Sequence, residues 1–221
     1  MNRRRLAAAL ISAPCAIGCL VSCVADDPVD PADAILRVSI DSCAPGNEDR
    51  ATAVSIGDGL ALTVAHSFDD AEAVSVSVAD GDPVGAELVY LDRGRDIALL
   101  AFDDSVMDSD ARSGLRVHSD DDDPADDARI VVYRSGGVVI RPVELLQRTE
   151  ITLDGEGRRE SIKLGAAIEP GDSGAPVIDV EGRIIGLVFA TSRTGDTGWA
   201  IAGSELVPVR DLAGAAVRLP C

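Results

Sequence analysis

Short apolar runs with a two-residue alternation follow one another along most of the chain, and turn-forming residues separate them. Each run is bounded by Gly, Asp or Pro, which is typical of β-strands joined by tight turns. The first set of predicted strands covers residues 35–40, 53–56, 60–64, 73–78, 87–91 and 97–102. The second set covers residues 130–133, 138–143, 148–153, 161–164, 177–179, 184–190 and 199–201. Only residues 204–217 have a helical period, which predicts a closing helix and then an extended tail.

Two sets of about six strands indicate an all-β chain of two packed six-stranded antiparallel β-barrels with a short C-terminal helix. A two-sheet sandwich fits the strand count almost as well, so the pattern leaves both open. The expected units are an N-terminal barrel over residues 35–103, an acidic linker over residues 104–127 and a C-terminal barrel over residues 128–221. Aromatic residues make up only 3% of the chain, so the cores must be built from Val, Ile, Leu and Ala.

The acidic linker contains the run Asp120-Asp121-Asp122-Asp123. Clustered carboxylates are the ligands that Ca²⁺ takes, so a calcium site was one alternative. The run has no loop-forming Gly and no defined ligand spacing. We therefore interpret it as a charged linker and expect neither a metal nor a cofactor.

The N-terminus has the pattern of an export signal. Three arginines at positions 3–5 precede an apolar run over residues 6–21, which is too short to span a membrane comfortably. We predict a signal peptide over residues 1–22, and the adjacent arginines leave a twin-arginine route open. Residues 23–34, rich in Asp and Pro, are predicted to be a disordered tether.

The end of the signal resembles a bacterial lipobox, Leu20-Val21-Ser22-Cys23, in which cleavage leaves a lipidated Cys23. Ordinary cleavage after Ala25 is the competing interpretation. The expected location is therefore the cell surface or periplasm as a lipoprotein, and otherwise the secreted fraction.

The cysteines form an even set once the signal is removed. Cys15 and Cys19 would leave with it, and lipidation would use Cys23. Cys43 and Cys221 then remain as a pair in an oxidising compartment, which predicts a disulfide between them. Two free thiols are the alternative.

The formal net charge is −18, and Lys163 is the only lysine. Loss of the arginine-containing signal makes the charge still more negative. Such a surface repels nucleic acid and anionic lipid, so neither is expected as a ligand. Membrane contact is expected only through a lipid anchor.

The segment Gly171-Asp172-Ser173-Gly174 places a serine in a tight turn just before an apolar run. Such a turn exposes the serine hydroxyl, and Gly171 lets backbone N–H groups converge on one point, as acyl transfer requires. An ordinary glycine-rich hairpin would have the same composition.

Two histidines are present, and they differ in context. His66 ends an apolar run, where it could be a core residue or a general base, whereas His118 lies in the polar linker. Asp96 stands directly before an apolar strand, so its carboxylate needs a buried partner, and the His66 ring could provide one. Asp92 is a rival, but charged residues follow it.

Taken together, these segments resemble the trypsin/chymotrypsin-like serine protease superfamily over roughly residues 50–203. The similarity is carried by Thr-Val-Ala-His ending at His66, Asp-Ile-Ala-Leu-Leu starting at Asp96 and Gly-Asp-Ser-Gly-Ala-Pro around Ser173. The segments 167–171 and 198–201 look like the bacterial HtrA-type branch. Residues 186–191, with the two outer cysteines, are similar to MarP-type proteases, which have a disulfide between the equivalent ends.

The resemblance implies a role for each residue. Ser173 would be the nucleophile, His66 the general base and Asp96 the group that fixes the imidazole tautomer, while the N–H groups of Gly171 and Ser173 would form the oxyanion hole. It places a primary specificity pocket at Ala167, Phe189, Ala190 and Thr191.

Two of these pocket positions depart from the family pattern. Members that prefer basic side chains have an acid where Ala167 stands, so small or medium apolar side chains are expected here. Digestive-type members have a serine, which supports the triad Asp, where Phe189 stands.

The sequence thus predicts an exported serine endopeptidase that hydrolyses polypeptides through an acyl-enzyme intermediate. No segment like a PDZ domain follows the protease unit, so a monomer is expected. The alternative is a catalytically inactive trypsin-like binding protein. An α/β-hydrolase esterase would need a Gly-x-Ser-x-Gly elbow and the chain order Ser, Asp, His, and the sequence has neither.

Overall fold

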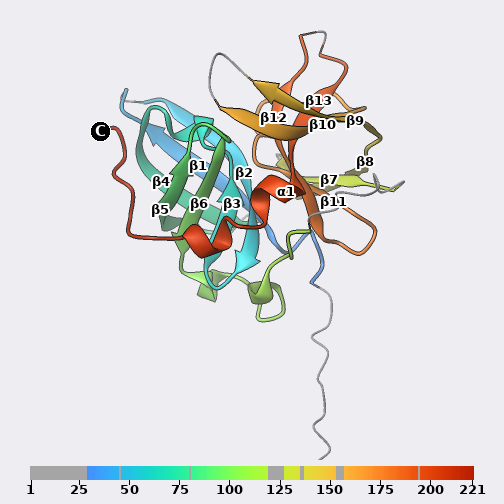
Figure 1. Cartoon of the computed structure of the whole chain (residues 1–221). Helices are drawn as coiled ribbons and strands as arrows, with labels where there is room; N and C mark the ends of the chain where they lie inside the picture. The colour runs from blue at the N-terminus through green and yellow to red at the C-terminus, as the bar shows by residue number, and fades with distance from the viewer. Residues whose placement is uncertain are drawn as a thin grey trace, which may run out of the picture.

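Two β-rich halves lie side by side in the protein (Figure 1). The computed structural model describes residues 29–44, 46–79, 81–118, 127–134, 137–152, 157–193 and 195–221. The predicted signal peptide, the lipidation residue Cys23 and the acidic run 120–123 lie outside these ranges. Within them, no helix has the length and apolar character that crossing a bilayer requires.

The first half is a closed antiparallel barrel in which the strands are ordered β1-β2-β3-β6-β5-β4. Its strands are β1 (Ile35–Ser42), β2 (Glu48–Gly57), β3 (Leu60–Thr63), β4 (Ala71–Val78), β5 (Val84–Asp92) and β6 (Ile97–Phe102). The interior is filled by small and branched side chains, with Phe68 the one fully buried aromatic in this cluster. The predicted six-stranded barrel is confirmed.

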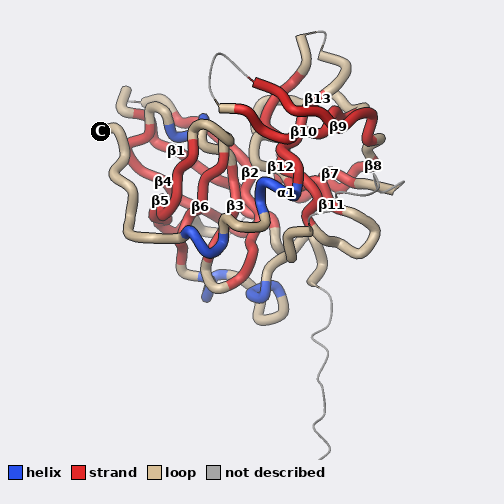
Figure 2. The backbone as a smooth tube through the Cα atoms, viewed as in Figure 1, coloured by secondary structure: helices blue, strands red, loops and turns tan. Residues whose placement is uncertain are grey.

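The second half is a seven-stranded antiparallel sheet, shown in red to the right of the barrel in Figure 2. Its strands are β7 (Arg129–Arg134), β8 (Gly137–Pro142), β9 (Leu145–Thr152), β10 (Arg158–Leu164), β11 (Pro176–Ile178), β12 (Ile184–Thr191) and β13 (Gly198–Ala202). The order is β8-β7-β11-β12-β13-β10-β9, so the consecutive strands β8 and β9 lie at its two ends. The all-β prediction is confirmed, and the seven strands correspond to the seven predicted runs, one more than a six-stranded barrel contains.

An apolar layer joins the two halves and contains side chains from both, among them Val54, Leu62, Leu187 and Ile201. The segment predicted as a linker contributes to this layer. It contains the short helices η2 (Asp104–Val106) and η3 (Ala111–Ser113), and then runs between the halves with Leu115 buried. Backbone hydrogen bonds from Leu115 to Ser55 and from His118 to Ile184, both 2.8 Å, hold it to each half in turn.

The chain enters the fold through residues 29–34, the last part of the segment predicted as a tether. Val29 packs against the apolar layer, and residues 31–34 form a turn that leads into β1, with Ala34 fully buried.

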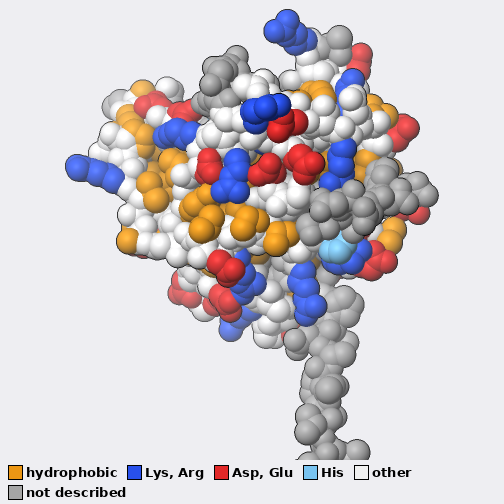
Figure 3. Space-filling model, viewed as in Figure 1, with side chains coloured by type: hydrophobic (Ala, Val, Ile, Leu, Met, Phe, Trp, Pro, Cys, Tyr) orange, Lys and Arg blue, Asp and Glu red, His pale blue; other side chains and the backbone are white. Residues whose placement is uncertain are grey.

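The C-terminal segment differs from the helix predicted over residues 204–217. It forms one turn of helix, α1 (Gly203–Leu206), then the short helix η4 (Arg210–Leu212) and an extended tail. Pro208 has no N–H to continue the helical ladder, so the helix stops before it. The tail lies along β5 through N–H bonds from Gly214 to Val89 and from Val217 to Leu88. Val207 and Leu212 of this segment are exposed. Apolar side chains also gather on the face shown in Figure 3.

A disulfide joins Cys43, just after β1, to Cys221 at the end of the tail. The predicted pairing is confirmed, with the two Cα atoms 5.9 Å apart and a sequence separation of 178 residues. The bridge fastens the tail to the barrel at a point beyond its backbone hydrogen bonds.

Removing this bridge is expected to lower stability substantially. In the chain-entropy model a loop of this length contributes at most about 5 kcal/mol. Cys43→Ser should therefore lower the Tm by roughly 10 °C, and the reduced wild type should melt at the same temperature as the variant. Thermal unfolding followed by circular dichroism, with and without reductant, measures this. An unchanged Tm would show that the bridge does not stabilise the fold.

Candidate active site

Asp96 ends the tight turn between β5 and β6 and adopts a left-handed backbone conformation with φ of +60°. Aspartate tolerates this region better than most residues because its short side chain can bond locally. The side chain points into the boundary between the halves, and the residue is 6% exposed. Asp92, the rival in sequence, instead anchors the same turn by accepting from the N–H of Arg95 (3.0 Å) and its Nε (2.7 Å).

His66 begins the short helix η1 (His66–Phe68), directly beyond the end of β3. Its ring Nδ1 lies 2.9 Å from Oδ2 and 3.1 Å from Oδ1 of Asp96, and its backbone N–H donates to Oδ1 at 2.8 Å. A carboxylate only accepts, so Nδ1 carries the proton and Nε2 is left as an acceptor. The side chain is 44% exposed, which gives that nitrogen access to a substrate.

The surroundings of His66 shift the pKa of its ring in opposite directions. Burial of the ring lowers its pKa, but the hydrogen bond to Asp96 and the negative charges of Asp96 and Asp69 raise it and outweigh burial. The positive charge of Arg159 acts in the lowering direction. The net result is a pKa above the ordinary value for histidine.

The Ser173 turn is fastened to the first barrel by two buried threonines. Thr52 donates its N–H to the carbonyl of Ser173 and its hydroxyl to the carbonyl of Gly171, both at 2.8 Å. Thr63 in turn donates its hydroxyl to the carbonyl of Thr52 at 2.8 Å. Gly174, with φ of +83°, lies so close to both threonines that any side chain there would collide with them. These bonds hold the half-buried Ser173 against Thr52 of β2, which is itself bonded to Thr63, the last residue of β3 and three residues before His66.

Two backbone donors in this turn are free to bind an anion. In the described part of the chain, the N–H groups of Gly171 and Ser173 donate to no protein acceptor, whereas that of Asp172 between them donates to Glu169. Gly171 adopts φ of +95°, a conformation that glycine allows. Across the described ranges the Ser173 hydroxyl makes no hydrogen bond to His66, and in free enzymes such contacts often tighten only when substrate binds.

Asp172, next to Ser173, is held by two arginines from the second half. Its carboxylate accepts from Nη2 of Arg134 at 2.8 and 2.9 Å and from Nη2 of Arg141 at 3.0 Å, and it also accepts the N–H of Glu169 at 3.1 Å. The residue is 1% exposed, so the ion pairs compensate a buried charge. Sequence reasoning missed this cluster, although Asp172 belongs to the motif that located Ser173.

The residues assigned to a specificity pocket are spread over β12 and the loop before Ser173. Ala167 is exposed, and its carbonyl accepts from Arg141 at 3.0 Å. Phe189 is buried, whereas Ala190 is half-buried and Thr191 exposed at the end of β12. Nearby, Ile168 lies so close to Gly198 that any side chain at Gly198 would collide with it.

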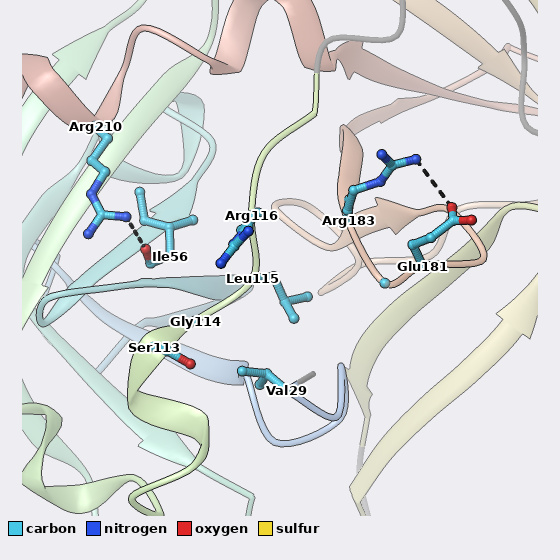
Figure 4. A pocket seen from close by; sticks show the side chains of 10 residues that line it. Val29, Ile56, Ser113, Gly114, Leu115, Arg116, Glu181, Arg183 and Arg210 are labelled. Atoms are coloured by element: carbon cyan, nitrogen blue, oxygen red, sulfur yellow. Dashed lines mark hydrogen bonds and ion pairs between the residues drawn. The ribbon is translucent and has the colours of Figure 1, made fainter. Parts of the chain in front are cut away.

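A cavity of about 490 Å³ lies away from these residues, between the linker, η4 and the β11–β12 turn (Figure 4). Arg210 donates to the carbonyl of Ile56 and Arg183 to Glu181 at its rim. None of the predicted triad lines it. In the described ranges, no group of three or more His, Cys, Asp or Glu side chains could hold a metal ion.

The family model of the trypsin-like peptidase domain matches residues 51–187, more than half of the chain. The chain belongs to the trypsin-like peptidase family. The matched range includes His66, Asp96 and Ser173, and the closed barrel with the second sheet beside it is consistent with the double-barrel fold of a trypsin-like peptidase.

This trypsin-like peptidase is similar in sequence and in structure to bacterial proteases. The serine protease Do-like HtrA of Bacillus subtilis is 29% identical over 167 residues, which is 70% of this chain and 36% of that protein. The chain thus spans about a third of that relative's length. The active form of the Rv3671c protease from M. tuberculosis superposes with a TM-score of 0.74 at 21% identity, covering 86% of this chain and 85% of that one. The HtrA-type protease AlgW gives 0.68 at 24% identity, covering 81% and 60%. These likenesses in structure agree with the fold.

Proposed function

We propose that this trypsin-like peptidase is an exported serine endopeptidase in which Ser173, His66 and Asp96 form the catalytic triad. One observation carries the proposal: the Nδ1 of His66 is hydrogen-bonded to a nearly buried Asp96, which leaves Nε2 as a base. The turn that Thr52 and Thr63 hold against the first barrel would supply the serine, and this supports the proposal.

In the first half-reaction, the Ser173 Oγ bonds to the scissile carbonyl carbon while its proton passes to Nε2 of His66. The carbonyl oxygen becomes an anion that accepts from the N–H groups of Gly171 and Ser173, each worth a few kcal/mol in the transition state. The imidazolium then protonates the leaving nitrogen as the C–N bond breaks. Water, deprotonated by His66, attacks the acyl ester and releases the acid and the serine. Asp96 stays ionised throughout.

The proposal includes a preference for small or medium apolar side chains. No acid stands at Ala167, and Ile168 packs against Gly198 beside the loop that leads to Ser173. We further propose that the chain acts outside the cytoplasm as a monomer, held by a lipid on Cys23 or released after cleavage at Ala25. Intact mass spectrometry of the membrane fraction separates the two, because an unmodified N-terminus beyond Ala25 would contradict lipidation.

Incubation of the oxidised protein with a library of unfolded peptides, followed by mass spectrometry of new termini, tests the activity. We expect cleavage within peptides after small or medium apolar residues, and none with Ser173→Ala. If oxidised, folded protein cleaves nothing, the triad is not competent and the chain is a binding protein of the same fold.

The acidic side of the pH–activity profile reports the charge state of His66. Only neutral imidazole accepts the serine proton, so kcat/KM should rise with pH through the pKa of His66, at a higher pH than for an ordinary histidine. Asp69→Asn removes a charge that raises this pKa, so the midpoint should move to lower pH. Asp49→Asn, an exposed change on β2, is the control. A midpoint that rises in Asp69→Asn would contradict this electrostatic account.

A further inference from the structure

Arg159 is a buried cation beside the proposed triad. It lies on β10 between the exposed residues Arg158 and Glu160, and it is 1% exposed. No larger side chain is buried to that degree in the described part of the protein. Arginine is almost never fully buried unless it is paired, so its environment must compensate the charge.

Two contacts with described residues contribute to that environment. Nη1 of Arg159 lies 3.4 Å from Oδ2 of Asp96, the same oxygen that approaches the ring nitrogen of His66 most closely. The guanidinium carbon lies 5.1 Å from the centre of the Phe189 ring, within the range of a cation–π interaction. The Phe189 ring therefore packs against one face of the planar guanidinium, while the carboxylate of Asp96 forms an ion pair with it.

The backbone brings these groups together at a glycine-to-glycine contact. Gly94, in the turn that presents Asp96, packs against Gly157, two residues before Arg159. A Cβ at Gly157 would lie 2.7 Å from the carbonyl oxygen of Gly94, so no larger residue fits there without a shift. The turn between β5 and β6 and the start of β10 are thus locked against each other.

We propose that Arg159 is a positioning residue of the active site, which acts through Asp96 by placing a second cation beside that carboxylate and holding it turned toward His66. The proposal rests on the proposed function. It also gives Phe189 a role, since the ring that replaces a polar residue of other family members supports the guanidinium. In this arrangement the first half supplies Asp96 and His66, and the second half supplies the positive charge of Arg159 beside the Asp96 carboxylate.

The charge balance decides which protonation state of His66 is favoured. The charged groups that face its ring are Asp96 from the β5–β6 turn, Asp69 after η1 and Arg159 from β10, and Asp69 is itself paired with Arg93. With Arg159 present, the charge of Asp96 is shared between two cations. Without it, protonated His66 would be the only cation beside Asp96 among the described residues, and the imidazolium, which cannot act as a base, would gain stability.

Titration of His66 by NMR tests this directly, because the chain has only two histidines and His66→Gln assigns the signal. In Arg159→Met, which keeps length but removes charge, the titration midpoint of His66 should move to higher pH. Arg158→Met changes the exposed neighbour, which pairs with Glu150, and should leave the midpoint unchanged. A midpoint that stays in place or falls in Arg159→Met would overturn the proposal.

The rate of Ser173 labelling by a fluorophosphonate gives the second readout. Below the midpoint, Arg159→Met should label about tenfold more slowly than wild type, and most of the rate should return at higher pH. The titration does not depend on turnover. If the midpoint moves but no variant or wild type is ever labelled, the endopeptidase proposal fails while the coupling of Arg159 to His66 stands.

A double-mutant cycle keeps the test decisive if Arg159→Met alone does not fold. Asp96→Asn removes one negative charge from beside the buried Arg159, so Asp96→Asn with Arg159→Met should have a higher Tm than Asp96→Asn alone. Arg159→Lys, which retains the charge, should keep the wild-type midpoint. A double variant that melts below Asp96→Asn would show that Arg159 serves packing and not the charge of Asp96.

Discussion

Asp96→Asn should lower kcat/KM by about 10⁴-fold while leaving the fold in place. The amide is nearly the size of the carboxylate, so the backbone N–H of His66 keeps an acceptor. The NH₂ group of the new amide, however, can donate to Nδ1 of His66, which would place the imidazole proton on Nε2. A protonated Nε2 cannot accept the proton of Ser173. The loss also removes the charge that stabilises the imidazolium in the transition state.

Peptide-cleavage kinetics with a matched control measure this effect. Asp211→Asn makes the same change on the exposed surface of η4 and should keep wild-type kinetics. Near-ultraviolet circular dichroism should report the same tertiary packing in both variants. An Asp96→Asn protein that retains activity within tenfold of wild type would exclude Asp96 from the triad.

Asp172→Asn is expected to have the second largest effect, on both stability and reactivity. It leaves Arg134 and Arg141 beside a neutral amide, and breaking a buried ion pair costs up to about 5 kcal/mol. The two arginine side chains are 29% and 26% exposed and can regain some hydration, so we expect about 3 kcal/mol. Because Asp172 lies between the two free N–H donors, the rate of Ser173 labelling should fall about 100-fold.

A second buried acid in the same half provides the matched control for this loss. Asp179 is 1% exposed and lies away from the site. Its carboxylate accepts from the backbone N–H of Arg183 at 2.8 Å and from the Nε of Arg183 at 2.6 Å. Asp179→Asn should therefore lower the free energy of unfolding without slowing the labelling of folded protein. Equal labelling rates in the two variants would mean that Asp172 only stabilises the fold.

The strands were predictable because alternation and turn residues are local signals. Each of the thirteen strands in the described ranges overlaps a predicted run. Pairing partners were harder to predict, since they depend on register between distant segments. The antiparallel pair β3–β6, with Thr63 opposite Ala98, places His66 and Asp96 at one end of the sheet. The order of the motifs in the sequence indicated that His66 and Asp96 lie close together, but not the distances between their atoms.

The supporting residues gave no such local signal. Arg158, Arg159 and Glu160 form a charged run of the kind found on a solvated surface, yet the strand turns Arg159 inward. Asp172 is separated by 38 and 31 residues from its two arginines, so nothing near it in sequence indicated a partner. The prediction of a helix over residues 204–217 was wrong. The periodic pattern continues across Pro208, but the helix ends before this proline.

Labelling of oxidised residues 26–221 with a fluorophosphonate probe tests the central claim most directly, since the probe reacts only with an activated serine. The account predicts one adduct per chain, mapped by mass spectrometry to Ser173 and absent from Ser173→Ala. A folded, disulfide-bonded protein that forms no adduct at Ser173 would contradict it, and the His66–Asp96 pair would then belong to a peptidase fold that does not catalyse.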